Sequence, residues 1–183
     1  MLKVVCRSNI LKHIIIFFIF LFNINTLLAQ EECKFDNKLL TSILMNEYHP
    51  KKDIGYEYLI SFNNKNDAKR VKALIPDYFI DNRTIDCQNK ETCVFLYSQL
   101  RENKISNLDL GPFQINSLYH KHEPDKYFSM NSSYTIACNY LTTLVNEKGY
   151  NWYAIASYHS KTPSLNEIYK EKLIKNMLIL NNH

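Results

Sequence analysis

The sequence predicts a mostly helical single domain with one small β segment after the first helix. Apolar residues recur every three or four positions through most of the chain, which is the period of an amphipathic helix. Only residues 53–63 alternate and are rich in aromatic and β-branched types, as an extended strand is. The 183 residues include three glycines, no internal repeat and no low-complexity linker, so nothing marks a second domain.

The N-terminus has the three parts of a secretory signal peptide. Three basic residues precede an apolar run over 14–22, and Ala29 offers a small residue before the cut. We therefore predict a signal peptide over 1–29, a mature domain over 30–183, and a periplasmic or exported location. The apolar run is short for a bilayer crossing. A retained anchor is the alternative, because Leu27 is a poor residue at position −3 of a cleavage site.

The net charge argues against a nucleic-acid partner. The whole chain carries 22 Lys and Arg against 18 Asp and Glu, but three of the basic residues and none of the acidic ones lie in the leader. That leaves 19 basic and 18 acidic residues in the mature domain, which is close to neutral. Nucleic-acid binding needs many cations to neutralise phosphates, so we expect no such partner.

The first half of the mature domain is expected to hold two helices around the β segment. A helix over Asn37–Glu47 places its apolar residues on one face. The β segment over 53–63 follows it. A short basic helix over Asp67–Leu74 is then ended by Pro76, which cannot continue a helix.

The second half is expected to hold four more helices, recognised by their start and stop residues. Gly149 ends the second of them, and Pro163 precedes the last. In chain order they are a helix capped by Asp86 that runs through Cys93, Leu96 and Leu100; a helix from Ser132 with Ala137, Leu141 and Leu144 on one face; a short helix over Trp152–Tyr158; and a final helix opened by Ser164 and Glu167 as a capping box.

Four cysteines follow the leader, at positions 33, 87, 93 and 138. An even number in an exported chain indicates disulfides, for which three pairings exist. Cys87 and Cys93 are close in sequence, so we predict that they pair and that Cys33 pairs with Cys138. Buried free thiols are the alternative. The spacings are not those of a zinc ribbon, and we expect no metal site.

Glu47 is the candidate catalytic acid. It lies on the apolar face of its helix, four residues after Ile43, and at the helix C-terminus, where the dipole disfavours an anion. Burial and the dipole both raise a carboxyl pKa, and a protonated carboxyl can donate to a glycosidic oxygen. The alternative is a boundary glutamate that reaches solvent before the His49-Pro50 turn.

Residues 111–116, Gly-Pro-Phe-Gln-Ile-Asn, have the composition of a turn that faces a ligand. The amides of Gln114 and Asn116 can hydrogen-bond a neutral polar molecule, while Phe113 and Ile115 fix their direction. A plain turn that leads into a helix would have a similar composition.

Three motifs in order resemble those of the lytic transglycosylases of bacterial cell walls: Glu47 at a helix end, Gly-x-x-Gln-Ile-Asn over 111–116, and Ala-x-Tyr over 156–158. The Asp-Leu-Gly over 109–111 is similar to members that accompany secretion and conjugation machines. The resemblance covers roughly residues 37–172. It implies a lysozyme-like fold, peptidoglycan glycan strands as substrate, no cofactor, and a secretion or conjugation apparatus as a candidate partner.

The resemblance also implies roles for individual residues. Glu47 would protonate the leaving oxygen of the MurNAc-β-1,4-GlcNAc bond and then deprotonate the substrate's own 6-hydroxyl, leaving 1,6-anhydroMurNAc. Gln114 and the backbone near Phe113 would bind N-acetyl groups, with Asn116 also lining the groove. Tyr158 would point its hydroxyl at Glu47.

Two positions depart from the family pattern. Tyr48 follows Glu47 where the family commonly has Ser, and His159 follows Tyr158 where the family commonly has Asn. We do not assign His159 as a base, because a histidine at a helix end more often contacts solvent or a carbonyl. His120 and His122 are expected on the surface.

Alternatives remain open in the chemistry. A hydrolytic lysozyme could use the same Glu47 with a water, and a peptidoglycan-binding component of a secretion apparatus could keep the groove without turnover. A second carboxylate, which most glycosidases need, could be Asp53, Glu57 or Asp109, but no pattern places one. Tyr56, Tyr58 and Phe62 could stack on sugars or pack in the core. Residues 48–110, 63 in number, are more than compact members of the family have in this place.

Overall fold

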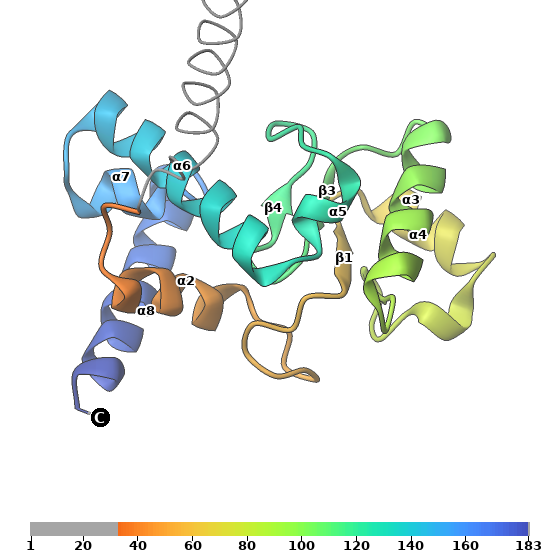
Figure 1. Ribbon diagram of the computed structural model, residues 1–183, viewed down its shortest axis with the longest axis horizontal. Helices are drawn as coiled ribbons and strands as arrows, with labels where there is room; N and C mark the ends of the chain where they lie inside the picture. Colours follow the sequence, from red (N-terminus) through yellow and green to blue (C-terminus); the bar gives the residue numbers. More distant parts are fainter. Residues whose placement is uncertain (1–32, 183) are drawn as a thin grey trace, which may run out of the picture. The chain divides into compact units, whose positions relative to one another are not determined.

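The computed structural model describes residues 33–182 as a mixed α+β domain with a small antiparallel sheet (Figure 1). The predicted signal peptide lies outside the described residues. No helix within 33–182 is long and apolar enough to cross a bilayer. In chain order the elements are α2 (Asn37–Glu47), β1 (Leu59–Phe62), α3 (Lys65–Lys72), a 3-10 turn η1 (Pro76–Tyr78), β2 (Thr84–Asp86), α4 (Lys90–Glu102), β3 (Leu108–Leu110), β4 (Ile115–Asn116), α5 (Pro124–Tyr127), α6 (Met130–Lys148), α7 (Trp152–Ala156) and α8 (Pro163–Asn181).

The four strands form one antiparallel sheet in the order β2-β1-β3-β4. Its register puts Ser61 of β1 opposite both Thr84 of β2 and Asp109 of β3, and Asp109 opposite Asn116 of β4. Residues that are directly opposite share a face. One face therefore carries a row of four polar side chains that crosses the whole sheet.

The other face of the sheet is apolar and belongs to the core. Ile60 and Phe62 alternate with Ser61 along β1 and are almost fully buried, together with Ile85 of β2 and Leu110 of β3. Helices α3 and α4 both contact β1. One face of the sheet is therefore polar and the other packs in the core, because alternate side chains of a strand point to opposite sides.

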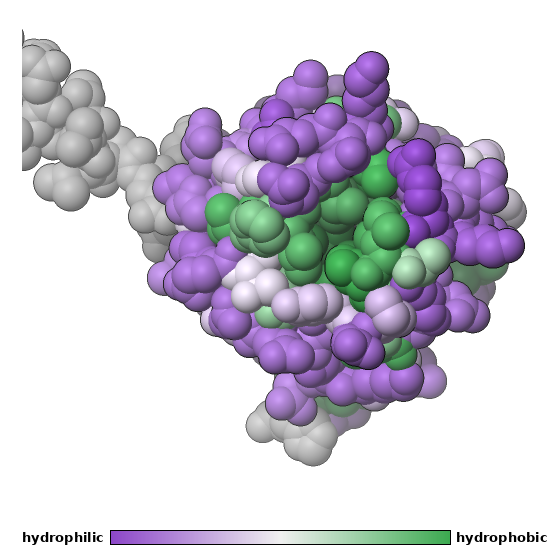
Figure 2. Space-filling view, turned by 90° about the vertical axis from the view of Figure 1, so that its right-hand side faces the viewer, coloured by the Kyte–Doolittle hydropathy of each residue, from purple (hydrophilic) through white to green (hydrophobic). Residues whose placement is uncertain are grey.

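Apolar side chains are also exposed on the side of the molecule that carries α3 and α4. Figure 2 views the side of the molecule that carries α3 and α4, and it shows apolar side chains gathered in a hollow with polar side chains around it. Leu74, just after α3, is 77% exposed, and Phe95 on α4 is 62% exposed. These exposed side chains belong to the helical layer, because the apolar residues of the sheet beneath it are almost fully buried.

The remaining long helices pack on one another beside the sheet (Figure 1). Helix α2 contacts α8 and α6, and the short α7 contacts the same two helices. Buried residues from each of them, including Leu40, Ile43, Leu141, Ile155 and Leu173, form one continuous core with the sheet. The C-terminal end of α2, where Glu47 lies, is thereby held against the rest of the domain.

Both predicted disulfides are confirmed. Cys33 pairs with Cys138, so the segment before α2 is tied to α6 across 105 residues of sequence. Cys87 pairs with Cys93, which joins the end of β2 to α4 across six residues. One bridge fixes the helical part and the other fixes the sheet.

Several predicted helix boundaries were wrong. Helix α3 spans Lys65–Lys72 rather than 67–74, and α7 ends at Ala156 rather than 158. Asp86 does not cap α4, because it is the last residue of β2 and pairs with Leu59; Asn89 is the N-cap, and its side chain accepts a hydrogen bond from the N–H of Thr92 at 2.9 Å. Ser164 and Glu167 form no capping box. Pro163 takes the first helical position of α8, and the cap residue before it makes no side-chain hydrogen bond.

Helix α6 starts two residues earlier than the predicted Ser132, and its cap comes from elsewhere in the chain. Its own N-cap residue, Ser129, makes no side-chain hydrogen bond. The carboxylate of Glu57 instead accepts a hydrogen bond from the N–H of Met130. An anion at a helix N-terminus satisfies a free donor and opposes the helix dipole, so Glu57 has a structural role.

Candidate active site

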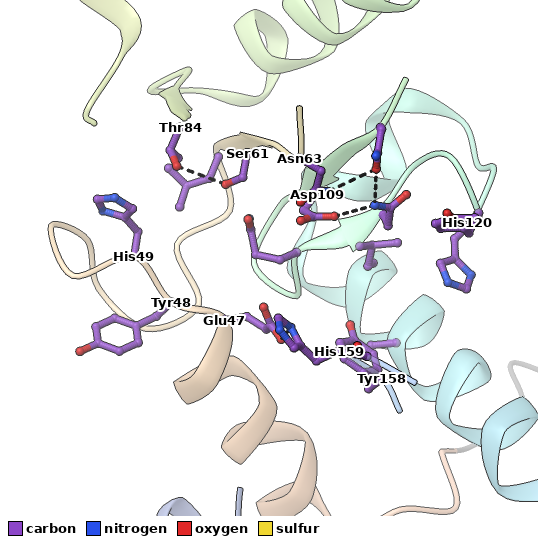
Figure 3. A pocket seen from close by; sticks show the side chains of 18 of the residues that line it. Glu47, Tyr48, His49, Ser61, Asn63, Thr84, Asp109, His120, Tyr158 and His159 are labelled. Atoms are coloured by element: carbon purple, nitrogen blue, oxygen red, sulfur yellow. Dashed lines mark hydrogen bonds and ion pairs between the residues drawn. The ribbon is translucent and has the colours of Figure 1, made fainter. Parts of the chain in front are cut away.

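A cavity of about 1180 Å³ opens over the polar face of the sheet (Figure 3). It is lined by the end of α2, the polar row of the sheet, one face of α6, and the connection from α7 to α8. Of the residues singled out in the sequence, Glu47, Gln114, Asn116 and Tyr158 all line this cavity. Segments more than 40 residues apart are therefore brought to one site.

Glu47 ends α2 inside the cavity, and Tyr48 leaves the helix in an extended conformation. The Glu47 side chain is 13% exposed. Burial raises its pKa from 4.5 to about 7, and the charge of Asp109 adds to the rise. A hydrogen bond from Tyr169 and the charges of Arg83 and Lys172 oppose it. Near neutral pH, Glu47 is therefore present in both its protonated and its charged form.

Tyr169 on α8 holds the Glu47 carboxylate. Its hydroxyl donates a hydrogen bond to Glu47 Oε1 at 2.7 Å, and the ring is 5% exposed. The ring of His159 stacks on it, with centroids 4.8 Å apart and planes within 4°. The sequence analysis did not identify Tyr169 as a partner of Glu47. Its signal is the spacing of buried residues on α8 (Asn166, Tyr169, Leu173), since a buried tyrosine hydroxyl needs a partner.

Tyr158 does not make the bond that the resemblance implied. Its hydroxyl donates to the backbone carbonyl of Phe113 at 2.9 Å, and a hydroxyl has one proton to give. The prediction that this proton goes to Glu47 is therefore corrected, with Tyr169 in its place. Tyr158 instead ties the end of α7 to the turn that carries Gln114.

The turn over 111–116 has a backbone that few residues could adopt. Gly111 has φ +68°, and a Cβ there would lie 1.9 Å from the carbonyl oxygen of Tyr127. Gln114 has φ +46° despite its side chain, and its Nε2 donates to the carbonyl of Gly111 at 2.8 Å. Phe113 is fully buried beneath the turn and is not part of the cavity lining. The turn is therefore fixed before any ligand arrives.

Asp109 is a second carboxylate of the cavity, besides Asp81, which is bound to His49. Asp109 lies on β3 and faces Glu47 from the sheet side (Figure 3). Burial raises its pKa; hydrogen bonds from Asn63 and Asn116 and the charge of Arg83 oppose the rise. The Asn116 amide donates to Asp109 Oδ1 at 2.9 Å. Of the three carboxylates left open by the sequence, Asp109 alone lines this cavity.

Of the three histidines considered in the sequence, only His120 differs from its expected place. The Nδ1 of His159 is 3.8 Å from Glu47 Oε1, but burial lowers its pKa, so at neutral pH the contact is not an ion pair. His120 lines the cavity and packs on the ring of Tyr140 at 4.1 Å, which corrects its assignment to the surface. His122 is exposed as expected.

Several other residues resolve alternatives left by the sequence. Tyr48 lines the cavity, but its ring points away from Glu47 (Figure 3). Phe62 is buried in the core and Tyr58 packs against it, whereas the Tyr56 hydroxyl donates to Asp86 Oδ1 at 2.8 Å. None of the three lines the cavity. Residues 48–110 supply β1, β2, β3, α3 and α4, and hence most of the sheet side of the site; the rest comes from β4 and the turn before it.

The cavity can perform acid/base chemistry on a polar ligand. It combines a carboxyl group of pKa about 7 with a second carboxylate and side-chain amides on the opposite side. Within residues 33–182, no group of three His, Cys, Asp or Glu residues is placed to hold a metal ion. No model of a protein family, no curated protein and no solved structure matches this chain.

Proposed function

We propose that this protein is a peptidoglycan lytic transglycosylase with a lysozyme-like domain, and that Glu47 is its acid and base. The observation that carries the proposal is a glutamate whose pKa is raised to about 7, in a large cavity whose opposite side is rich in amides and hydroxyls and also carries Asp109 and Arg83. Such a surface suits a polymer rich in N-acetyl and hydroxyl groups.

The reaction needs Glu47 in two forms. As an acid it donates its proton to the glycosidic oxygen while the bond from that oxygen to the muramyl C1 breaks. As a carboxylate it then takes the proton of the muramyl 6-hydroxyl, whose oxygen attacks C1 and closes the 1,6-anhydro ring. Glu47 ends as it began, and no water is consumed. A pKa near the working pH suits both transfers.

The neighbours of Glu47 support each half of this cycle. Burial favours the acid that starts the reaction, and the Tyr169 hydrogen bond stabilises the carboxylate that ends it. Asp109 faces the same space and, when ionised, would stabilise the positive charge that develops at C1. Tyr169 thus takes the orienting role that the motif gave to Tyr158.

Asp109 also favours a second candidate, a hydrolytic lysozyme. Glycosidases that add water commonly use a pair of carboxylates on either side of the scissile bond, and Glu47 and Asp109 line one cavity from α2 and from the sheet. In that reaction a water, rather than the 6-hydroxyl, would attack C1. The products differ, because only the transglycosylase leaves 1,6-anhydro ends.

Export and assembly belong to the same proposal. The two disulfides are typical of an oxidising compartment outside the cytosol, and this agrees with the leader-like N-terminus. A secretion or conjugation apparatus is the proposed partner, because Asp-Leu-Gly at 109–111 resembles the motif of the family members that accompany such machines.

The test is digestion of purified sacculi, with mass spectrometry of the released muropeptides. Anhydro ends support the transglycosylase, reducing ends support the lysozyme, and wild-type protein that binds sacculi but releases nothing supports the non-catalytic alternative. Glu47→Gln keeps the shape of the side chain but cannot cycle a proton, so turnover should fall by about 10²–10⁴-fold. Glu171→Gln, an exposed position on α8, is the matched control and should keep full activity.

A further inference from the structure

Arg83 is a charged residue of the cavity to which the proposed reaction gives no role. Its backbone is fixed: the N–H donates to Asp81 Oδ1 at 2.7 Å, and the carbonyl accepts from the N–H of Phe62 at 2.8 Å. Its side chain is 54% exposed and lines the cavity just before β2. A firmly held backbone therefore presents a guanidinium group to the open space above the sheet.

The guanidinium has donors to spare. Its contact with Asp109 joins Nη2 to Oδ2 at 3.7 Å, which is well beyond the 2.7–2.9 Å of a charge-assisted hydrogen bond. Five N–H donors in a planar fork can bind a carboxylate with two parallel hydrogen bonds. The charge lies close to the reacting groups, because it lowers the pKa of both Glu47 and Asp109.

The other cations around the cavity are differently placed. Lys51 donates from Nζ to the carbonyl of Ile80, and His49 is bound to Asp81 at 3.1 Å. Lys161 is more exposed than Arg83, at 61%, and faces Glu147, which is not part of the cavity lining. Arg83 is therefore the cation best placed to meet an anionic group on a ligand that lies between Glu47 and the sheet.

We infer that Arg83 binds a carboxylate carried by the muramyl residue. Through this contact the protein would bind peptidoglycan in preference to neutral glycans such as chitin. The inference rests on the proposed function, and it concerns the choice of substrate rather than the bond cleavage. Two sources offer the same chemistry: the free lactyl carboxylate of a strand without peptides, and the carboxylate of D-glutamate in the stem peptide.

The experiment measures binding rather than turnover, by titration calorimetry in a Glu47→Gln background. This background prevents cleavage and removes the titration of Glu47, which loss of Arg83 would otherwise disturb. The probes are three GlcNAc-MurNAc tetrasaccharides. One has free lactyl carboxylates, one carries L-Ala-D-Glu on each muramyl residue, and one is neutral because its lactyl groups are methyl amides.

Arg83→Gln should weaken one or both of the charged probes by about tenfold, as expected for a charged hydrogen bond at a half-exposed position, and leave the neutral probe unchanged. Loss on the first probe alone identifies the lactyl group, and loss on the second alone identifies the peptide. Arg83→Lys keeps the charge but not the fork, and should fall between Gln and Arg. Arg70→Gln, an exposed arginine on α3 outside the cavity, is the matched control for net charge.

Two results would overturn the inference. One is a loss that is equal on the neutral and the charged probes, and the other is no change on any probe. If the Glu47→Gln protein with Arg83 intact binds none of the three glycans, the proposed function fails as well. That outcome differs from both of the others, because it appears before Arg83 is changed.

Discussion

The two sides of the cavity differ in how far their polar groups are buried. On the helical side, Glu47, Tyr169 and Tyr158 are largely buried, and both tyrosine hydroxyls have protein partners. On the sheet side, Arg83 and the amides of Gln114 and Asn116 lie at partly exposed positions. Burial in a low-dielectric site shifts a pKa. The amides of Gln114 and Asn116 already donate to protein groups, whereas the long contact of Arg83 with Asp109 leaves the guanidinium with donors for a ligand. The comparison assigns chemistry to the helices and recognition to the sheet.

The largest expected effect is the loss of stability when either disulfide is removed, one from the helical part and one from the sheet. Replacing Cys33 and Cys138 together by Ser opens a loop of 105 residues, which should lower the free energy of unfolding by roughly 5 kcal/mol. The same change at Cys87 and Cys93 opens a loop of six residues and should cost roughly 2 kcal/mol. Urea denaturation of the two variants measures both values. Equal losses would contradict the loop-length argument.

The next effect is the pH dependence of stability that follows from the raised pKa of Glu47. A carboxyl whose pKa is raised from 4.5 to about 7 binds its proton more tightly in the folded state. Its contribution to stability is complete below pH 4.5 and is lost as the pH rises to 7. The loss is on the order of 3 kcal/mol, since one pKa unit corresponds to about 1.4 kcal/mol.

Glu47→Gln carries no charge and should not show this loss. We expect the variant to match the wild type near pH 4 and to be on the order of 3 kcal/mol more stable at pH 8. Denaturation curves at a series of pH values check the difference, with Glu171→Gln again as the control. A difference in stability that is constant with pH would show that folding does not raise the pKa of Glu47.

The smallest expected effect is on the pH dependence of activity, and it should differ between Tyr169 and Tyr158. Tyr169→Phe removes a hydrogen bond that lowers the Glu47 pKa, so the fall of activity at alkaline pH should move to a higher pH, with turnover reduced about tenfold. Tyr158→Phe removes the bond to the Phe113 carbonyl and should leave the pH profile in place. Rate profiles of both variants from pH 5 to 9 provide the test. A shift with Tyr158→Phe, and none with Tyr169→Phe, would restore the assignment made from the motif.

Local patterns explain what the sequence predicted correctly. Helix Asn37–Glu47 has the predicted bounds, because its apolar period stops just before His49 and Pro50. The short spacing of Cys87 and Cys93 made their pairing the simplest of the three. Within residues 33–182, each of these predictions needed only neighbouring residues to be considered.

Long-range contacts explain what the sequence could not predict. Strands β2, β3 and β4 have two or three residues each, which is too few to show a period, and only their pairing puts Asp109 opposite Ser61 and Asn116. Tyr158 and Tyr169 are both tyrosines near the end of the chain. Which hydroxyl reaches Glu47 depends on how α7 and α8 pack, and no local pattern contains that information.

The cap of α6 has a consequence for motion. Glu57 accepts a hydrogen bond from the N–H of Met130, and a Cβ at Gly55 would lie 2.9 Å from the end of the Met130 side chain. The loop after Glu47 and the first turn of α6 are thus joined at one point. Local opening of that loop exposes the first amides of α6 to solvent, so both segments should exchange their hydrogens as one cooperative unit. The amide of Met130 is therefore a natural reporter for the opening of the loop that follows Glu47.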